Sequence, residues 1–218
     1  MFKSIFLIVV KKNRYLLDPK KFSKLSWEEY IPEDLSQLYE IYDYHHASAI
    51  LANEFKEEFD DICEALRNFS FKQSDITTGG GNESRIPKIF SDLLRPKWDE
   101  KQLKAKLIVD DEEQSIHTHL VDYIHGRVAF DLEWNSKDQT FDRDLYAFRA
   151  FFEFNKISVG VVVTRSLTLN PLFVSLGILA KYGASTTHIG KLLPRLNAGR
   201  NGGCPVLVFG ITPNLYEQ

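Results

Sequence analysis

The sequence has few cysteines, and the two that it has are not spaced for chemistry. Cys63 and Cys204 lie far apart in a chain of 218 residues, and no CxxC spacing occurs. Disulfide frameworks and zinc ribbons need several closely spaced cysteines, so neither is indicated. We expect both thiols to be small residues of the core.

Long apolar runs are also absent. The opening stretch is uninterrupted by charge only over residues 4–10, which is too short to span a bilayer, and no signal-peptide cleavage region follows it. With 44% hydrophobic residues, a chain of this length suits one α/β domain with a substantial core. We predict a single domain over residues 1–218 of a cytoplasmic protein, with no membrane partner and with residues 4–10 as a core strand.

A nucleotide-binding loop is missing as well. The glycine-rich residues 77–84 (TTGGGNES) lack the Lys-Ser/Thr pair that ends a phosphate-binding P-loop. We interpret this segment as a flexible loop and predict that the protein uses no nucleotide cofactor.

Acidic residues are missing from the C-terminal part of the chain. Residues 154–216 contain no Asp or Glu, although the overall charge is −3. The cations of this stretch are Lys156, Arg165, Lys181, Lys191, Arg195 and Arg200. Residues 1–24 are basic too, with seven Lys or Arg and one Asp. Such a distribution suits contact with the phosphates of nucleic acid, or it balances acids elsewhere in the fold.

Apolar periodicity predicts the elements of the fold. Spacings of three and four within residues 47–69 predict one long amphipathic helix, and strict alternation over residues 127–134 predicts a strand. Further helices are expected at residues 141–152, 172–182 and 189–196, and buried strands at residues 158–164 and 205–211. This order predicts an α/β fold with a central mixed β-sheet flanked by helices.

Two carboxylates share one face of the predicted strand. Asp131 and Glu133 are two positions apart, or roughly 7 Å, so both can reach one centre. Asp122 precedes them, and Gly126 can turn the chain so that Asp122 comes beside Asp131. Two carboxylates with a backbone carbonyl, such as that of Leu132, suit Mg²⁺. Glu133 would then position or deprotonate the attacking water.

Two other interpretations of these acids remain open at this stage. Asp131 and Glu133 could face solvent from a half-exposed strand, with Asp122 in a turn. Three histidines also surround Asp122 in sequence and could hold zinc, although their spacing fits known zinc hydrolases poorly: His117, His119 and His125.

A polar, glycine-rich loop is expected over residues 197–203 (NAGRNGG). It could place Arg200 and the adjacent Asn201 in a groove of DNA, since arginine reads guanine with two hydrogen bonds. It could equally be a connection between the preceding helix and the last strand.

Three segments, taken in order, resemble restriction endonucleases of the BglII and BstYI type, within the PD-(D/E)xK nuclease superfamily. They are residues 42–51 (YDYHHASAIL), 122–134 (DYIHGRVAFDLEW) and 205–213 (PVLVFGITP). Several motifs in the right order are more specific than the carboxylates alone. The resemblance implies a nuclease core over residues 42–218 and leaves residues 1–41 as an N-terminal extension.

The resemblance implies a Mg²⁺-dependent homodimer that binds double-stranded DNA, each subunit cutting one strand of a short palindrome. Asp122 falls on the first metal-binding aspartate of the family and Asp131 on its second acidic ligand. Glu133 falls on a position that is Gln in the most similar enzymes and Lys in much of the superfamily. That departure leaves the number of metal ions and the identity of the base open.

The resemblance also implies two groups of DNA contacts. The first group follows the catalytic strand and comprises Asn135, Ser136 and Lys137. The second group aligns with a recognition segment of the family and comprises Ser185, Thr186 and Thr187. We add three candidates from the basic stretch and its loop: Arg165, Arg200 and Asn201. Specificity depends on a few hydrogen bonds in the major groove, so the target sequence does not carry over.

Two alternatives to an ordinary restriction enzyme stay open. The protein could cut only modified DNA, or it could be a DNA-binding or interaction module whose acids no longer hold metal. Residues 1–41 could add a strand or helix to the sheet, or form a basic arm that contacts DNA.

Overall fold

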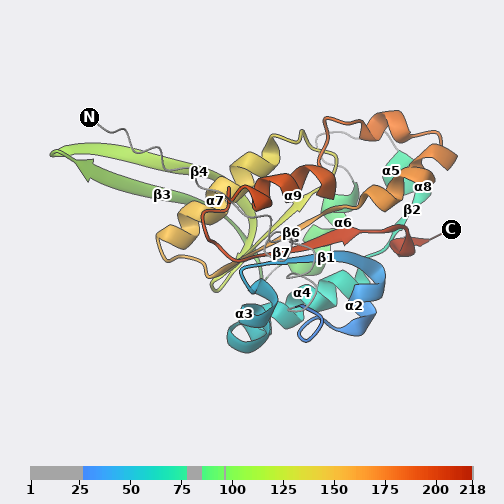
Figure 1. Ribbon diagram of the computed structural model, residues 1–218, viewed down its shortest axis with the longest axis horizontal. Helices are drawn as coiled ribbons and strands as arrows, with labels where there is room; N and C mark the ends of the chain where they lie inside the picture. The colour runs from blue at the N-terminus through green and yellow to red at the C-terminus, as the bar shows by residue number, and fades with distance from the viewer. Residues whose placement is uncertain (1–26, 78–84, 96, 218) are drawn as a thin grey trace, which may run out of the picture.

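A six-stranded mixed sheet forms the centre of the computed structural model, which describes residues 27–77, 85–95 and 97–217 (Figure 1). The strand order is β1-β7-β6-β5-β4-β3. The strands are β1 (Tyr39–Tyr44), β3 (Asp99–Val109), β4 (Glu112–His125), β5 (Val128–Glu133), β6 (Val159–Arg165) and β7 (Val206–Ile211). A separate two-stranded sheet pairs β2 (Phe71–Lys72) with β8 (Tyr216–Glu217).

The three middle strands, β5, β6 and β7, run parallel to one another, whereas β1 and β4 pair with them in the antiparallel sense. Parallel neighbours need crossover connections, and helices supply them here. α7 (Thr140–Glu153) joins β5 to β6, and α8 (Asn170–Ser175) and α9 (Ile189–Asn197) lie between β6 and β7. The carboxyl ends of β5 and β6 therefore meet at one edge of the sheet.

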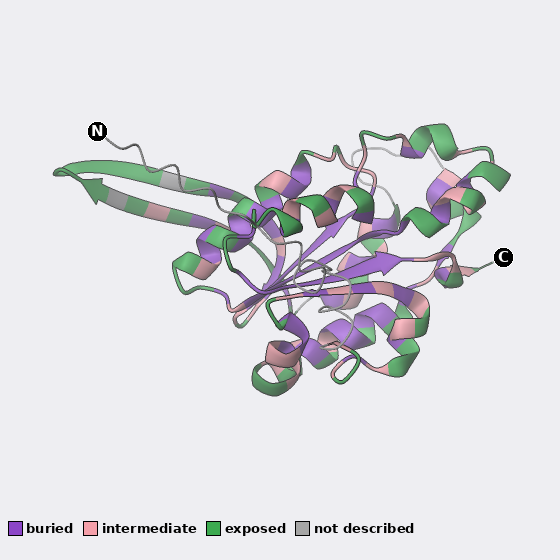
Figure 2. Ribbon diagram, viewed as in Figure 1, coloured by how far each residue is buried: buried purple, intermediate pink, exposed green. Residues whose placement is uncertain are grey.

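Helices cover both faces of the sheet and divide the core in two (Figures 1 and 2). α7 and α9 pack on one face. The other face carries α2 (Glu33–Leu38), α3 (Ala47–Glu54), α4 (Lys56–Asn68), α5 (Gln73–Thr77), α6 (Arg85–Leu94) and α8. Short 3-10 turns complete the chain at Leu167–Leu169, Leu179–Tyr182 and Pro213–Leu215. The predicted α/β class, with a mixed sheet between helices, is confirmed.

The alternation over residues 127–134 is confirmed as β5. Val128, Phe130 and Leu132 enter the core under α4 and α6, whereas Ala129 enters the core under α7. The predicted buried strands at residues 158–164 and 205–211 correspond to β6 and β7, and the helices at 141–152 and 189–196 correspond to α7 and α9. Strong local patterns thus located the middle of the sheet and the helices over one face.

The prediction of one long helix over residues 47–69 is wrong. The chain leaves the helical region at Phe55 (φ −129°, ψ 52°), which ends α3 and begins α4. Leu51 and Phe59 on either side are both buried in the same core. The break lets α3 pack on the strands while α4 packs against α6. Tertiary contacts determine where the helix breaks, and the apolar periodicity of the sequence does not reveal it.

The prediction of a helix over residues 172–182 is also wrong in part. α8 ends at Ser175, and the chain continues to a short 3-10 turn at Leu179–Tyr182. Gly177 between them has φ +69°, the left-handed conformation that commonly ends helices.

The β3–β4 hairpin was not predicted. It projects from the globule as a long arm, and Figure 2 shows most of the arm exposed. Its base is anchored by Leu103, Thr118 and Val121, which are buried. Most described residues of β3 are exposed or half-buried, so no buried apolar face marked this strand in the sequence.

The described part of the N-terminal extension contributes α2 and the first residues of β1, which pairs with β7 at the sheet edge. For residues 27–41 the added helix and strand are thus observed, whereas the basic residues 1–24 of the possible arm lie outside the described residues. The predicted strand at residues 4–10 lies outside the described residues, as does the glycine-rich loop beyond Thr77. Among the residues that the structure does describe, no helix has the length and apolarity to cross a membrane.

Gly160 provides a test of the packing between α7 and β6. A Cβ added there would lie 2.3 Å from the ring of Phe148, which is itself fully buried. We expect Gly160→Ala to lower the free energy of unfolding by about 1–3 kcal/mol, because an overpacked core must shift. Urea denaturation measures this. Gly183→Ala is the control, since its nearest neighbour would be 3.7 Å away, and an equal loss in both variants would contradict the packing argument.

Candidate active site

The turn between β4 and β5 brings Asp122 beside Asp131. Gly126 occupies this turn with φ +54°, and the register then pairs Tyr123 with Phe130. One step further along the ladder, Asp122 lies opposite Asp131. The expectation that Gly126 turns the chain and brings the two aspartates together is confirmed.

The two aspartates are joined through the backbone. The amide of Asp122 donates to Asp131 Oδ1 at 2.7 Å, and the amide of Leu132 donates to Asp122 Oδ2 at 3.3 Å. Each carboxylate thus accepts a hydrogen bond from the opposite strand, which fixes its position without neutralising its charge.

Asp131 and Glu133 are buried, so the interpretation of a solvent-facing strand is wrong. Their side chains are 2% and 7% exposed. Asp131 Oδ2 and Glu133 Oε2 are buried with no hydrogen-bond partner. Carboxylates in this situation destabilise a fold unless something else compensates, and they are common at functional sites.

The pKa values of these acids reflect their burial. Burial, and then the neighbouring Asp122, raises the pKa of Asp131 well above its ordinary value. Burial raises the pKa of Glu133 to about 7, opposed by a hydrogen bond from Ser136. The site therefore holds more negative charge than the protein around it compensates, and a bound cation would relieve the repulsion.

Asp144 on α7 joins these acids and was not predicted. Its side chain is 3% exposed, and Asp144 Oδ2 is buried without a hydrogen-bond partner. Burial and the charge of Asp131 raise its pKa well above the ordinary value. A signal was present in the sequence, since Asp144 follows Phe141 by three positions and precedes Phe148 by four, within the apolar stripe of the helix.

The two predicted groups of DNA contacts lie side by side at the carboxyl ends of β5 and β6. Lys137 and Thr186 form an antiparallel bridge. The amide of Ser136 donates to Thr187 Oγ1 at 3.2 Å, and the amide of Thr187 donates to the carbonyl of Ser136 at 2.9 Å. We call residues 135–137 and 185–187 the paired segments.

The side chains of the paired segments differ in exposure. Lys137 and Ser185 are exposed, Ser136 and Thr186 are half-buried, and Thr187 is fully buried. Asn135 adopts a left-handed conformation (φ +62°) where the chain leaves β5, and its Oδ1 is buried without a partner. The exposed members can reach a ligand, while Thr187 holds the two segments together.

Arg165 is a buried residue that contacts the second of the paired segments. It is 1% exposed, and its Nη2 donates to Thr186 Oγ1 at 2.7 Å and to the carbonyl of Tyr182 at 3.2 Å. Its guanidinium carbon lies 5.5 Å from the centroid of the Tyr182 ring, and burial lowers its pKa to about 10. In this structure Arg165 organises the segment that follows Tyr182 and has little surface to offer a ligand.

Arg200 and Asn201 are not brought to the paired segments. Arg200 forms an ion pair with Asp142 on α7. Asn201 is fully buried, and its Nδ2 donates to the carbonyl of Cys204 at 2.7 Å, closing the loop before β7. Their contact with DNA stays a prediction, which for Asn201 would require the loop to open.

Several cations of the acid-free stretch pair with acids of α7 and the turn before it. Arg195 lies 3.0 Å from Asp142 and 3.7 Å from Asp138, and Lys191 lies 3.6 Å from Asp138. These contacts tie α9 to α7. Part of the positive charge of residues 154–216 is therefore balanced by acids within the fold. This was the alternative to contact with nucleic acid.

The histidines do not converge on Asp122. His125 lies toward α4, where its Nδ1 is 3.7 Å from Asp61 Oδ2 and its ring packs against Trp98. His117 and His119 are exposed along β4. In residues 27–77, 85–95 and 97–217, no three histidine, cysteine or acidic side chains stand close enough together to hold a metal ion.

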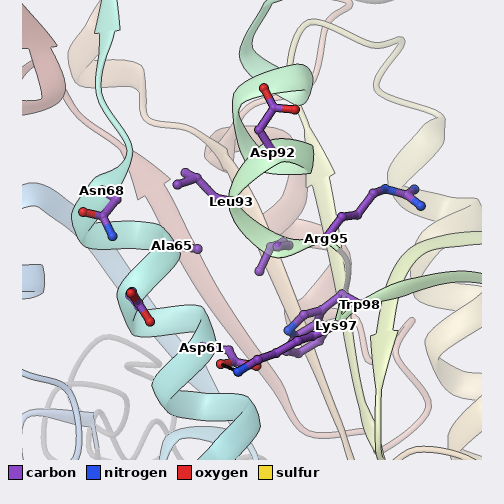
Figure 3. Close-up of a pocket in the computed structure, with 10 residues that line it drawn as sticks. Asp61, Ala65, Asn68, Asp92, Leu93, Arg95, Lys97 and Trp98 are labelled. Atoms are coloured by element: carbon purple, nitrogen blue, oxygen red, sulfur yellow. Dashed lines mark hydrogen bonds and ion pairs between the residues drawn. The ribbon is translucent and has the colours of Figure 1, made fainter.

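A hollow of about 260 Å³ lies between α4 and α6 (Figure 3). Asp122, Asp131, Glu133 and Asp144 do not line it. Asp61 and Lys97 at its floor form an ion pair of 2.7 Å, and Trp98 lies beside them. None of the predicted site residues lines this hollow. Its position on the other helical layer separates it from the carboxylates over β5.

Comparison with known proteins identifies a family for most of the chain. The model of the family described as restriction endonuclease BglII/BglIII matches residues 39–211. This range includes Asp122, Asp131, Glu133, Asp144 and the paired segments. A search of curated proteins gave no match. The resemblance predicted from residues 42–213 is confirmed.

Glu133 provides a test of the charge in this site. Its pKa rises from 4.5 in water to about 7 in the fold, so the folded protein keeps a proton on Glu133 that the unfolded chain has lost. This favours folding near pH 5 and the advantage disappears as pH rises through 7. We expect metal-free wild type to lose stability relative to Glu133→Gln between pH 5 and pH 8, measured by urea denaturation in EDTA. A stability difference that does not change with pH would contradict the burial of this charge.

Proposed function

Because the chain belongs to the BglII/BglIII restriction endonuclease family, we propose that it is a Mg²⁺-dependent type II enzyme with Asp122, Asp131 and Glu133 at the scissile phosphate. The family makes it a site-specific deoxyribonuclease that acts on double-stranded DNA. The observation that carries the proposed site is Asp131, a buried carboxylate bonded to the backbone of Asp122, with one oxygen that has no partner.

The oxygen donors at this site fit Mg²⁺. We propose that Asp122, Asp131 and the carbonyl of Leu132 hold the ion, with water completing its shell, as Mg²⁺ prefers. Two carboxylates and one carbonyl do not make a closed metal cage, so most of the remaining ligands would be water. When bound, Mg²⁺ supplies positive charge that stabilises the charge building on the phosphate during hydrolysis.

Glu133 is the residue proposed to position the attacking water. Its backbone carbonyl accepts from Thr164 Oγ1 at 2.8 Å, so β6 fixes the end of β5 from which the side chain projects. Its Oε2 has no hydrogen-bond partner among the described residues and remains available to a water. A carboxylate with a pKa near 7 can accept a proton at neutral pH.

The paired segments are proposed to bind DNA beside the acids. Lys137 is exposed and suits a phosphate, and Ser185 presents a hydroxyl for a base edge. A homodimer would place two such sites on a two-fold axis, one for each strand of a palindrome. Since the substrate is DNA, we propose that the enzyme acts in the cytoplasm.

Digestion of unmethylated phage DNA tests this function. We expect purified protein with Mg²⁺ to give discrete bands, because a nuclease of this family cuts at one short sequence. Asp122→Ala and an EDTA arm are each expected to leave the DNA intact, since both remove the metal from the site. Sequencing the ends of the fragments would give the cut position.

The same digestion on methylated DNA separates the remaining alternatives. Cleavage of methylated DNA only would replace the proposal with a modification-dependent nuclease. Intact DNA in every arm would contradict cleavage altogether and favour a DNA-binding module.

Lys137 provides a test of the DNA-facing side. With Ca²⁺ in place of Mg²⁺ to hold DNA uncut, we expect Lys137→Gln to weaken binding and to lower the slope of log affinity against log salt by about 1.8, because each subunit of the homodimer loses one phosphate contact worth about 0.9. Fluorescence anisotropy over a salt series measures both. Lys97→Gln is the control, since Lys97 pairs with Asp61 between α4 and α6. Equal slopes for wild type and Lys137→Gln would remove Lys137 from the interface.

A further inference from the structure

The hydroxyl group of Thr186 has both a donor and an acceptor partner inside the protein. It donates to the carbonyl of Gly183 at 2.7 Å and accepts from Arg165 Nη2 at 2.7 Å. The direction of each bond is fixed, because a carbonyl oxygen cannot donate and a guanidinium group cannot accept. The only proton of this hydroxyl is therefore in use, and one lone pair of Oγ1 remains.

Both partners of the Thr186 hydroxyl are held in place by other contacts. The amide of Thr186 also donates to the Gly183 carbonyl, at 3.1 Å, which closes a tight turn. Arg165 Nη2 also donates to the carbonyl of Tyr182 at 3.2 Å, and the Tyr182 ring stacks on Phe173 with centroids 4.2 Å apart. The hydroxyl thus lies between two groups whose positions the fold has already set.

Arg165 is a buried cation whose partners among the described residues are neutral. It is 1% exposed, and it contacts the Tyr182 carbonyl, the Tyr182 ring and Thr186 Oγ1. Burial of a charged group is costly unless its hydrogen bonds are made, and a bond from a charged donor is stronger than one from a neutral donor. Since Thr186 accepts the shorter of the two bonds, Arg165 holds the acceptor side of that hydroxyl in one orientation.

Thr186 keeps surface that a ligand can reach. It is half-buried and forms a bridge with the exposed Lys137 across the paired segments. Thr187, the next residue, is fully buried, and its Oγ1 accepts from the amide of Ser136. Thr186 is therefore the threonine of this segment that remains accessible beside Lys137.

We propose that Thr186 is a specificity-determining residue, which accepts a hydrogen bond from the amino group of adenine or cytosine in the major groove. Guanine and thymine present the acceptors O6 and O4 there instead, and an acceptor facing the lone pair of Thr186 makes no bond. To donate to such a base, the hydroxyl would have to give up its bond to Gly183. This inference rests on the proposed function, in which the paired segments bind DNA.

Two substitutions at position 186 isolate the lone pair. Thr186→Val has nearly the same shape but no oxygen, whereas Thr186→Ser keeps the hydroxyl. Ser175→Ala is the control, because Ser175 is exposed on α8 and its Oγ donates to the carbonyl of Leu172. The probe is the target duplex that digestion identifies, bound in Ca²⁺ and followed by fluorescence anisotropy.

Amino groups are removed from this duplex one position at a time, in both half-sites, by placing purine for adenine or 2-pyrimidinone for cytosine. At one position we expect wild type to lose affinity by about 25-fold, from about 5-fold for each of two contacts in the homodimer. Thr186→Val should lose much less there, while Thr186→Ser and Ser175→Ala should match wild type. An altered base pair affects every protein alike, so variants are compared on the same duplex.

Three results would overturn the inference. Equal losses for wild type and Thr186→Val at every position would show that Thr186 contacts no amino group. A difference that appears only with analogues lacking the oxygen of guanine or thymine would show that Thr186 donates. Differences at several positions would show that Thr186 shapes the whole segment and reads no single base. Each of these leaves cleavage by wild type intact, whereas a wild type that cuts no DNA removes the proposed function together with this inference.

Discussion

The reciprocal hydrogen bonds between Asp122 and the β5 backbone and between Asp131 and the β4 backbone are the interaction on which the site depends. They require the β4–β5 register, which a turn of two residues around Gly126 sets. A slip of one residue would turn Asp131 and Glu133 into the opposite core, under α4 and α6. The hairpin register is thus a condition of the chemistry as well as of the fold.

The other property of the candidate site is that its negative charge is buried. Asp131, Glu133 and Asp144 are each less than a tenth exposed, and each has one oxygen without a partner. In a core that is otherwise apolar this arrangement lowers stability, because buried like charges repel and lose hydration. A cation bound here would lower this repulsion between the carboxylates. If the proposed metal ion binds here, stability of the metal-free protein and affinity for the metal are opposed at this site.

Local sequence pattern predicted the elements whose burial is simple. β5 alternates between two cores, β6 and β7 are continuous apolar runs, and α7 carries a clear stripe, so each was identified. Prediction failed where the chain bends within an apolar stripe, as at Phe55, and where a strand has little burial, as in β3. For Phe55 the information lies in contacts with distant segments, which periodicity does not contain. β3 pairs with its neighbour in sequence, β4, and the arm that they form is mostly exposed, so it has no long apolar face to detect.

The sequence by itself determined the family, the carboxylates and the strand that presents them, because ordered motifs and a period of two are local properties. Only the tertiary structure decided which charges meet. Arg165 became a buried support. Lys191, Arg195 and Arg200 were paired with Asp138 or Asp142, and Asp144 was buried within the core-facing side of α7. The physical reason is that the free energy of a charged group depends on its burial and on its neighbours in space, and most of these neighbours are distant in sequence.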